Sequence, residues 1–234
     1  MKKYDAILFD MGYTLVYFEP SAAEITRRAY AEVGLQIDVE RLQAVWNEFW
    51  DEFYRQAATA TFEASEEYDR KARLERERRI MAALGVYDEA RLHAYLEKLD
   101  ALYREPGAVR LYPEVKGVLD ALQRKSYHLG IVSNWSWDLP DFCRQVGIRE
   151  YFAVILPSAR AGCSKPNPRI FHQALEKLKV PPQRAVYIGD SYEFDVVGAR
   201  AAGLEAILID RSADPAERDC AVIHNLEELL PLLE

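Results

Sequence analysis

Hydrophobic and polar positions follow two different patterns along this chain. From residue 128 onward, apolar runs of four to six residues are separated by stretches with helical periodicity, and a similar run, AILF, stands at residues 6–9. Short apolar runs bounded by turn residues are typical of strands buried on both faces of a parallel sheet. Their alternation with helices predicts βαβ units joined by right-handed crossovers.

The second half of the chain should therefore hold most of an α/β core. Strands are expected at residues 128–133, 154–156, 185–189 and 206–209, with a short edge strand at 222–223. Helices are expected around them, at residues 114–125, 138–146, 167–178, 195–202 and 226–232. Together with residues 6–9, these segments predict an α/β fold with a Rossmann-like parallel sheet and helices on both of its faces.

Residues 21–105 show the other pattern, with apolar positions at helical spacing and no convincing strand. The spacing predicts four helices with short connections, the third at residues 63–84 and the fourth at 88–105, and such an arrangement is typical of a small bundle. The chain is thus predicted to form an α/β core from residues 1–16 and 108–234, with residues 17–107 inserted after the first strand as an α-helical bundle.

The composition excludes several classes of function. Of the 234 residues, 50% are hydrophobic and 29% are charged, and the net charge is −8. A nucleic-acid-binding protein needs a basic face, so no nucleic-acid partner is expected. No apolar stretch approaches the roughly 18 residues of a membrane span, so no membrane partner is expected. Asp5 and Asp10 interrupt the apolar run near the N-terminus, which argues against a signal peptide and favours a cytoplasmic location.

The metal-binding residue types limit the possible metal sites. The three cysteines and four histidines are widely spaced, and no CxxC pattern occurs. Neither a disulfide framework nor a zinc site is therefore expected.

Polar residues occur where the predicted strands end. Alone, each is more commonly a turn or helix-cap residue. Parallel strands, however, bring their carboxyl ends to one edge of the sheet, where α/β proteins place their chemistry. The residues concerned are Asp10 and Thr14 after the first strand, Ser133 and Asn134 after the second, Lys165 in the loop CSKPNP, and Asp190 and Asp195 in the loop GDSYEFD.

This set of residues has a coherent chemistry. Three acids whose surroundings offer only oxygen ligands suit Mg²⁺, because clustered carboxylates repel one another unless a cation lies among them. A lysine with hydroxyl and amide donors beside that cation would form a site for a phosphoryl group. The reaction class that follows is metal-assisted phosphoryl transfer to an attacking carboxylate.

The same residues make the chain resemble the haloacid dehalogenase (HAD)-like hydrolase superfamily, in the branch whose helical cap follows the first strand. All four motifs of the family occur in order, as DMGYT at residues 10–14, SN at 133–134, KP at 165–166 and GDSYEFD at 189–195. The stretches LYPEVKGVLDALQRKSYHLGIVSN and SKPNPRIFHQAL extend the resemblance beyond the motifs. It covers the core, whereas the insert matches only in position and helicity.

The resemblance implies a role for each motif residue. Asp10 would attack phosphorus and form an aspartyl-phosphate, and Lys165 would neutralise the charge that develops on the phosphoryl group. Ser133 and Asn134 would hold the phosphoryl oxygens. Thr14, also counted with the phosphate-binding residues, would brace the loop that positions Asp10. Mg²⁺ would be bound by Asp10, by the backbone carbonyl of Gly12 and by Asp190, while Asp195 would support these ligands or orient Lys165.

The sequence departs from the family pattern at Gly12. Family phosphatases usually carry there a second aspartate, which protonates the leaving oxygen and then activates water. Loss of a positioned general acid and base typically costs roughly 10²- to 10⁴-fold in rate. The sequence therefore predicts a Mg²⁺-dependent phosphatase for a small phosphorylated metabolite, limited to good leaving groups.

Two alternatives stay open from the sequence. One is a non-catalytic or weakly active protein that binds a phosphorylated ligand. The other is a 2-haloacid dehalogenase, since those relatives also lack the second aspartate. They lack the metal-binding Gly-Asp as well, however, which this chain retains as Gly189 and Asp190. The oligomeric state stays open between a monomer and a homodimer.

Overall fold

The computed structural model describes residues 3–212 and 218–233. Residues 1–2, 213–217 and 234 of the predicted core lie outside the described residues. The chain folds into two compact units. The core unit comprises Met1–Val16, Gln56–Glu66 and Leu111–Glu234, and the helical unit comprises Tyr17–Arg55 and Glu67–Arg110.

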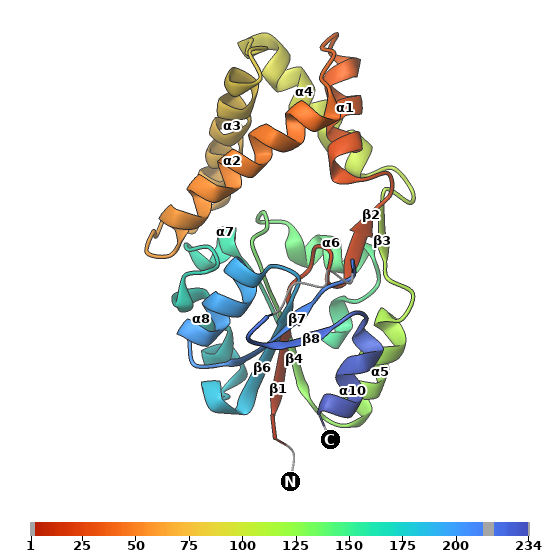
Figure 1. The fold of residues 1–234 in the computed structure, drawn as a ribbon, viewed down its shortest axis with the longest axis vertical. Coiled ribbons are helices and arrows are strands. Elements are labelled where there is room, and N and C mark those ends of the chain that lie inside the picture. Colours follow the sequence, from red (N-terminus) through yellow and green to blue (C-terminus); the bar gives the residue numbers. More distant parts are fainter. Residues whose placement is uncertain (1–2, 213–217, 234) are drawn as a thin grey trace. The chain divides into compact units, whose positions relative to one another are not determined.

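The core unit is built on a six-stranded parallel sheet (Figure 1). Its order is β5-β4-β1-β6-β7-β8, so β1 lies in the middle, between β4 and β6. The carboxyl end of β1 therefore lies between the carboxyl ends of these two strands, where doubly wound sheets place their ligands. The strands are β1 (Ala6–Phe9), β4 (His128–Ser133), β5 (Val154–Pro157), β6 (Ala185–Gly189), β7 (Glu205–Ile209) and β8 (Ala221–Ile223).

Helices cover both faces of the sheet, as the sequence predicts. In Figure 1, α8 lies on one side of the strands, and α5 and α10 lie together on the other. Alternate residues of β1 are buried toward opposite faces, and Ala6 and Leu8 belong to the cluster that also holds apolar residues of α8 and α9. The helices are α5 (Val115–Arg124), α6 (Leu139–Gln145), α7 (Ser158–Ala161), α8 (Pro168–Leu178), α9 (Gly198–Ala201) and α10 (Leu229–Leu232).

Several short elements differ from the prediction. The helix expected at 195–202 begins earlier, as the π-helix η3 (Tyr192–Val197), and continues into α9. The sequence also missed β2 (Val16–Phe18) and β3 (Val109–Leu111), which form a separate two-stranded sheet. Strands of three residues are too short to show an alternation of polar and apolar positions. Short turns of helix at η1 (Arg149–Tyr151), η2 (Pro182–Arg184) and η4 (Leu226–Glu228) complete the described elements.

The helical unit contains the four predicted helices. They are α1 (Ala22–Glu32), α2 (Val39–Ala57), α3 (Glu66–Ala83) and α4 (Glu89–Tyr103). Tyr30 of α1 and Tyr95 of α4 stack in its core, with ring centroids 4.3 Å apart. Ion pairs on the outside connect α3 to α2, through Arg79 and Glu52, and α3 to α4, through Arg73 and Asp100.

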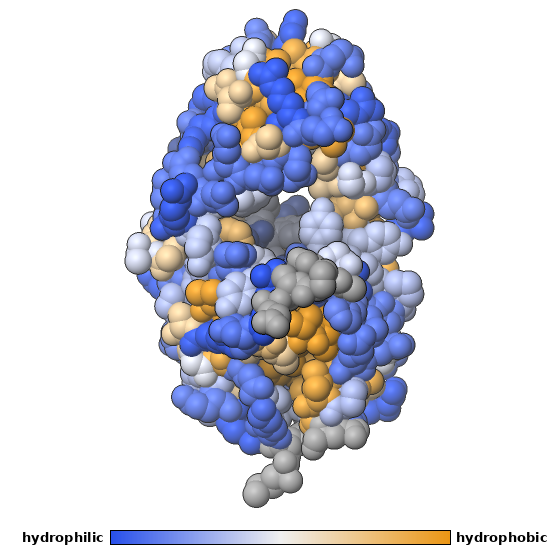
Figure 2. Space-filling model, in the orientation of Figure 1, coloured by the Kyte–Doolittle hydropathy of each residue, from blue (hydrophilic) through white to orange (hydrophobic). Residues whose placement is uncertain are grey.

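Most of the surface that Figure 2 shows is hydrophilic, and hydrophobic residues appear there in small patches. Among the described residues, no helix combines the length and the apolar character needed to cross a membrane.

One segment, from the end of α2 to the first residue of α3, departs from the predicted division of the chain. The sequence placed residues 17–107 in a single helical domain, but Gln56–Glu66 belongs to the core unit. The backbone N–H of Phe62 donates to the carbonyl of Gly162 (2.9 Å), and the side-chain amide of Asn167 donates to the carbonyl of Ala60 (3.2 Å). These two hydrogen bonds flank the loop that carries Lys165, and no hydrophobic pattern in the sequence predicts them.

Candidate active site

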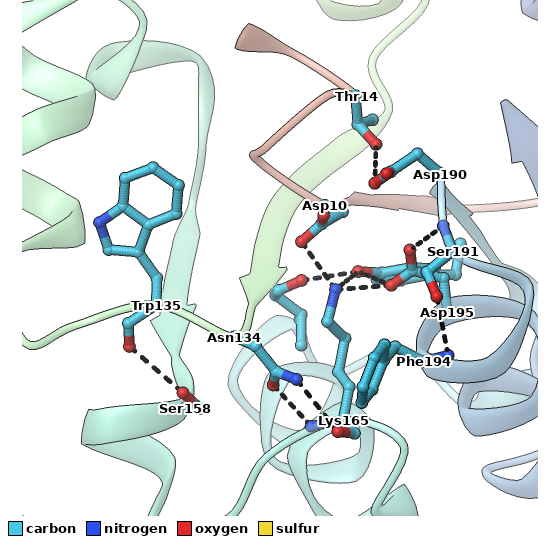
Figure 3. Close-up of polar contacts among 12 residues, drawn as sticks. Asp10, Thr14, Asn134, Trp135, Ser158, Lys165, Asp190, Ser191, Phe194 and Asp195 are labelled. Carbon is cyan, nitrogen blue, oxygen red and sulfur yellow. Dashed lines mark hydrogen bonds and ion pairs between the residues drawn. The ribbon is translucent and has the colours of Figure 1, made fainter. Parts of the chain in front are cut away.

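The centre of the site is the ammonium group of Lys165, which lies between two carboxylates (Figure 3). Its Nζ is 2.7 Å from Oδ1 of Asp10 and 2.5 Å from Oδ1 of Asp195, and all three side chains are almost completely buried. Asp10 directly follows β1, as predicted, and its N–H continues the ladder by donating to the carbonyl of Ile188 in β6 (2.8 Å). Lys165 is thus in direct contact with two other predicted site residues, Asp10 and Asp195.

The charge of Lys165 is stabilised by these contacts. Burial alone would lower the pKa of its ammonium group, but the charges of Asp10 and Asp195 outweigh that effect and raise the pKa above its ordinary value. Lys165 is therefore a permanent cation at neutral pH. Such a group can neutralise negative charge on a phosphoryl group, but it cannot act as a general acid there.

The side chain of Asn134 fixes the backbone of Lys165. Its side-chain Oδ1 accepts from the N–H of Lys165 (2.7 Å), and its Nδ2 donates to the carbonyl of the same residue (3.0 Å). The side-chain amide predicted to hold phosphoryl oxygens is thus engaged with Lys165 on both of its ends. Ser133, its neighbour, is buried at the end of β4, at the same edge of the sheet as Asp10.

Tyr187 of β6 is a member of the site that the sequence analysis missed. Its hydroxyl donates to the carbonyl of Val132 (2.6 Å) and accepts from Nζ of Lys165 (3.0 Å). Burial and the nearby charge of Asp195 raise the pKa of this phenol well above its ordinary value, so the group stays neutral. One sign was present in the sequence, a hydroxyl side chain within the otherwise apolar strand AVYIG.

Asp195 is fixed from both sides. Its Oδ1 contacts Lys165, and its Oδ2 accepts from the backbone N–H of Ser191 (2.9 Å). A Cβ atom on Gly189 would lie 2.3 Å from the carboxyl carbon of Asp195, so only glycine allows β6 to end this close to η3. With both oxygens engaged, Asp195 is suited to orienting Lys165, the second of the two roles that the sequence leaves open.

Asp190 completes the acidic cluster. Ligand oxygens of Asp10, Asp190 and Asp195 all lie within 4.8 Å of one another. Asp190 is the most exposed of the three acids. Desolvation of its carboxyl group by the surrounding protein, together with the charges of Asp10 and Asp195, raises the pKa of Asp190 well above the ordinary value. Thr14, which is completely buried, donates its hydroxyl to Oδ1 of Asp190 (3.4 Å). Thr14 thus braces Asp190, and its hydroxyl points to that carboxylate.

The donor set fits Mg²⁺. Clustered carboxylates repel one another and are stabilised by a cation, and oxygen-only surroundings are those that Mg²⁺ prefers. The backbone carbonyl of Gly12 accepts from the N–H of Thr14 (2.6 Å), and the second lone pair of that oxygen is left for a metal. Asp10, Asp190 and the carbonyl of Gly12 are the groups that would hold the ion, and Asp195 would support them through Lys165.

Trp135 lies beside the position where an aspartate is missing. A Cβ atom on Gly12 would have its nearest neighbour, Cζ3 of Trp135, at 3.9 Å, which is an ordinary van der Waals contact. The indole also packs on Phe142 of α6, with centroids 5.1 Å apart. Trp135 therefore packs against α6 and also lines the space next to Gly12. That space has room for a Cβ atom at position 12.

A haloacid dehalogenase-like hydrolase family model matches residues 4–203, a range that contains all of these residues. The chain belongs to the haloacid dehalogenase-like hydrolase family. It is 35% identical over 156 residues to the bovine (Bos taurus) haloacid dehalogenase-like hydrolase domain-containing protein 3, a match that covers 64% of this chain and 62% of the relative. It is 29% identical to a glyceraldehyde 3-phosphate phosphatase of Methanothermobacter thermautotrophicus, over 92% of this chain and 89% of that relative. A solved 2-haloacid dehalogenase from Pseudomonas syringae pv. tomato has the same fold, with a TM-score of 0.67, 27% identity and 98% coverage of both chains.

Binding of Mg²⁺ is expected to raise the melting temperature of this HAD-like hydrolase. At a concentration about a hundred times Kd, one bound ion stabilises the folded state by about 2.7 kcal/mol. Because the pKa of Asp190 is raised in the metal-free protein, the ion displaces protons, so its affinity should fall as the pH is lowered. The measurement is differential scanning fluorimetry with MgCl₂ against EDTA, at several pH values.

Asp190→Asn provides the matched control. This variant removes one of the three repelling carboxylates, so its metal-free form should melt above the metal-free wild type while its response to Mg²⁺ is lost. An unchanged response to Mg²⁺ would mean that the ion binds elsewhere.

Proposed function

We propose that the protein is a Mg²⁺-dependent phosphatase that hydrolyses small phosphate esters with good leaving groups through an aspartyl-phosphate on Asp10. The observation that carries the proposal is the pair of contacts made by Nζ of Lys165, at 2.7 Å from Asp10 and 2.5 Å from Asp195. The relative from Methanothermobacter thermautotrophicus, a phosphatase by name, supports it.

Each residue of the site has a distinct role in phosphoryl transfer. A carboxylate oxygen of Asp10 attacks phosphorus, the bond from phosphorus to the leaving oxygen breaks, and the leaving group takes the electron pair. Lys165 neutralises charge on the phosphoryl oxygens during this transfer. Mg²⁺, held by Asp10, Asp190 and the carbonyl of Gly12, would supply further charge neutralisation when bound. Water then attacks phosphorus, releases phosphate and restores Asp10.

The absence of an acid at Gly12 restricts which leaving groups the enzyme can release. No carboxyl group is attached at this position to protonate the departing oxygen, so the leaving group must be stable as an anion. Phenols and carboxylic acids meet this condition, whereas alcohols do not. The wild-type protein should therefore hydrolyse para-nitrophenyl phosphate and acetyl phosphate much faster than glycerol phosphate.

Gly12→Asp is expected to extend the range to alkyl phosphates. A Cβ at this position fits, since its nearest neighbour is 3.9 Å away, and the added carboxyl group should raise kcat for glycerol phosphate by roughly 10²- to 10⁴-fold. Gly12→Asn has nearly the same size but cannot transfer the proton, so it is the matched control. The measurement is the steady-state kcat and KM of both variants with para-nitrophenyl phosphate, acetyl phosphate and glycerol phosphate. If Gly12→Asn gains as much as Gly12→Asp, the effect is not general acid catalysis.

Dehalogenation is the second candidate, because the solved 2-haloacid dehalogenase shares the fold at 27% identity. The cluster of Asp10, Asp190 and Asp195 favours phosphate over halide, since displacement of a halide needs no cation. Release of chloride from 2-chloropropionate in the presence of EDTA would decide for the dehalogenase, and its absence together with hydrolysis of an aryl phosphate would decide for the phosphatase.

A further inference from the structure

The side chain of Arg211 contacts two separate segments of the core unit. It stands two residues after the end of β7, and its Nε and Nη2 donate to the carbonyls of Tyr13 (3.1 Å) and Thr14 (2.7 Å). Its Nη1 lies 2.9 Å from Oε1 of Glu114 in a largely buried ion pair, and its guanidinium carbon lies 3.3 Å from the centroid of the Tyr112 ring. One guanidinium group thus connects the loop after β1 with the segment that follows β3.

The loop that Arg211 holds is strained. Tyr13 has φ of +52°, in the left-handed region that a residue with a Cβ seldom adopts. Such a conformation is unfavourable for a residue with a Cβ and persists only where its surroundings fix it. The 2.6 Å hydrogen bond from the N–H of Thr14 to the carbonyl of Gly12 tightens the same turn. Arg211 supplies donors to the two carbonyls that follow this turn, at Tyr13 and Thr14.

The strained loop leads directly to the acidic cluster. Thr14 points its hydroxyl at Oδ1 of Asp190 (3.4 Å), and Asp10 lies four residues before Thr14 at the end of β1. A shift of this loop would therefore move both the brace on Asp190 and the carbonyl of Gly12.

We propose that Arg211 is a positioning residue, which fixes the strained Gly12–Tyr13–Thr14 loop and thereby sets the geometry of the Mg²⁺ ligands. The inference rests on the proposed function for its link to Mg²⁺, but the fixing of the loop can be measured without metal or substrate. Arginine is needed because its planar fork can donate in three directions at once, which the single ammonium group of lysine cannot do in this geometry.

The test compares Arg211→Met and Arg211→Lys with Arg184→Met. Arg184 is the matched control because it binds the other end of β1 in a similar way, with two donors on the carboxylate of Asp5 (2.9 and 2.6 Å) and one on the carbonyl of Lys3 (3.0 Å). The readouts are amide hydrogen exchange of the peptide covering residues 10–16, Mg²⁺ affinity by calorimetry, and kcat and KM for para-nitrophenyl phosphate.

Arg211→Met should accelerate exchange in residues 10–16 and weaken Mg²⁺ binding by roughly 10- to 100-fold, the usual effect of removing a group that orients metal ligands. It should lower kcat more than it raises KM, and Arg211→Lys should restore only part of each loss. Arg184→Met should leave the exchange of this peptide and the Mg²⁺ affinity at wild-type values.

A further variant tests the strain itself. Glycine adopts positive φ without cost, so the loop in Tyr13→Gly should depend less on Arg211. The loss of Mg²⁺ affinity on Arg211→Met should therefore be smaller in the Tyr13→Gly background than in the wild type.

Three results would overturn the inference: an unchanged exchange rate of residues 10–16 in Arg211→Met, an equal change in Arg184→Met, or full rescue by lysine. A wild-type protein that binds no Mg²⁺ would contradict the proposed function instead, and the exchange of residues 10–16 would then decide on Arg211 alone.

Discussion

Replacing Asp10 with asparagine is expected to abolish the hydrolysis of aryl and acyl phosphates, with a loss in kcat of at least about 10⁴-fold, typical for removal of a catalytic side chain that acts at the reacting atom. The amide has nearly the same shape but no negative charge, and it is a poor nucleophile toward phosphorus. Its oxygen can still accept a hydrogen bond from Lys165, so the fold should be retained. The measurement is single-turnover hydrolysis of para-nitrophenyl phosphate, with circular dichroism to check folding.

Asp5→Asn is the matched control for this variant. Asp5 stands at the other end of β1 and pairs with the side chain of Arg184 at the surface, so its loss should leave the turnover within about twofold of wild type. An Asp10→Asn variant that keeps a tenth of the wild-type rate would exclude Asp10 as the nucleophile.

Replacing Lys165 with methionine is expected to destabilise the protein by about 3–5 kcal/mol, because it leaves buried carboxylates without their cation. Asp10 and Asp195 both lose their partner at less than 3 Å, and neither can reach water easily. Turnover should be lost as well, since the charge on the transferred phosphoryl group is no longer neutralised. Urea unfolding in the presence of EDTA measures the stability without any compensation from a metal.

Two further variants distinguish the loss of the buried ion pair from a general effect of removing a lysine on stability. Lys3→Met removes a surface ion pair with Glu205, whose side chains are 61% and 48% exposed, and it should have little effect on stability. Adding Asp195→Asn to Lys165→Met removes one stranded carboxylate and should recover part of the lost stability. If Lys165→Met and Lys3→Met unfold at the same urea concentration, the buried ion pair does not stabilise the fold.

Much of the sheet and of the acidic cluster could be predicted because short apolar runs mark the buried strands and several of these runs end in a polar residue. The strand at residues 185–189 was predicted with the bounds that the structure has. Parallel pairing then brings Asp10 and Asp190 together without any knowledge of side-chain contacts. The family motifs added Lys165 and Asp195, whose approach depends on the loops.

The remaining features depend on how individual side chains and loops are oriented, which a pattern of polar and apolar residues does not specify. Asn134 was assigned to the phosphoryl group by its motif, yet its amide is turned to the backbone of Lys165. Arg211 follows a predicted strand like any surface residue, and its contacts with Tyr13 and Thr14 arise only because β7 ends near that loop. The segment Gln56–Glu66 joins the core unit through hydrogen bonds of its own backbone N–H and C=O groups, to which no pattern of its side chains corresponds.

The most direct test of the proposed function is to look for the phosphoryl group on Asp10. The protein is mixed with Mg²⁺ and excess para-nitrophenyl phosphate, quenched in acid within the first turnovers, digested, and analysed by mass spectrometry. Because Gly12 provides no base to activate water, the aspartyl-phosphate should break down slowly and accumulate on the peptide that contains Asp10. Asp10→Asn should carry no label, and Gly12→Asp should carry less than wild type. A phosphoryl group on another residue, or turnover without any labelled peptide, would contradict an aspartyl-phosphate mechanism at Asp10.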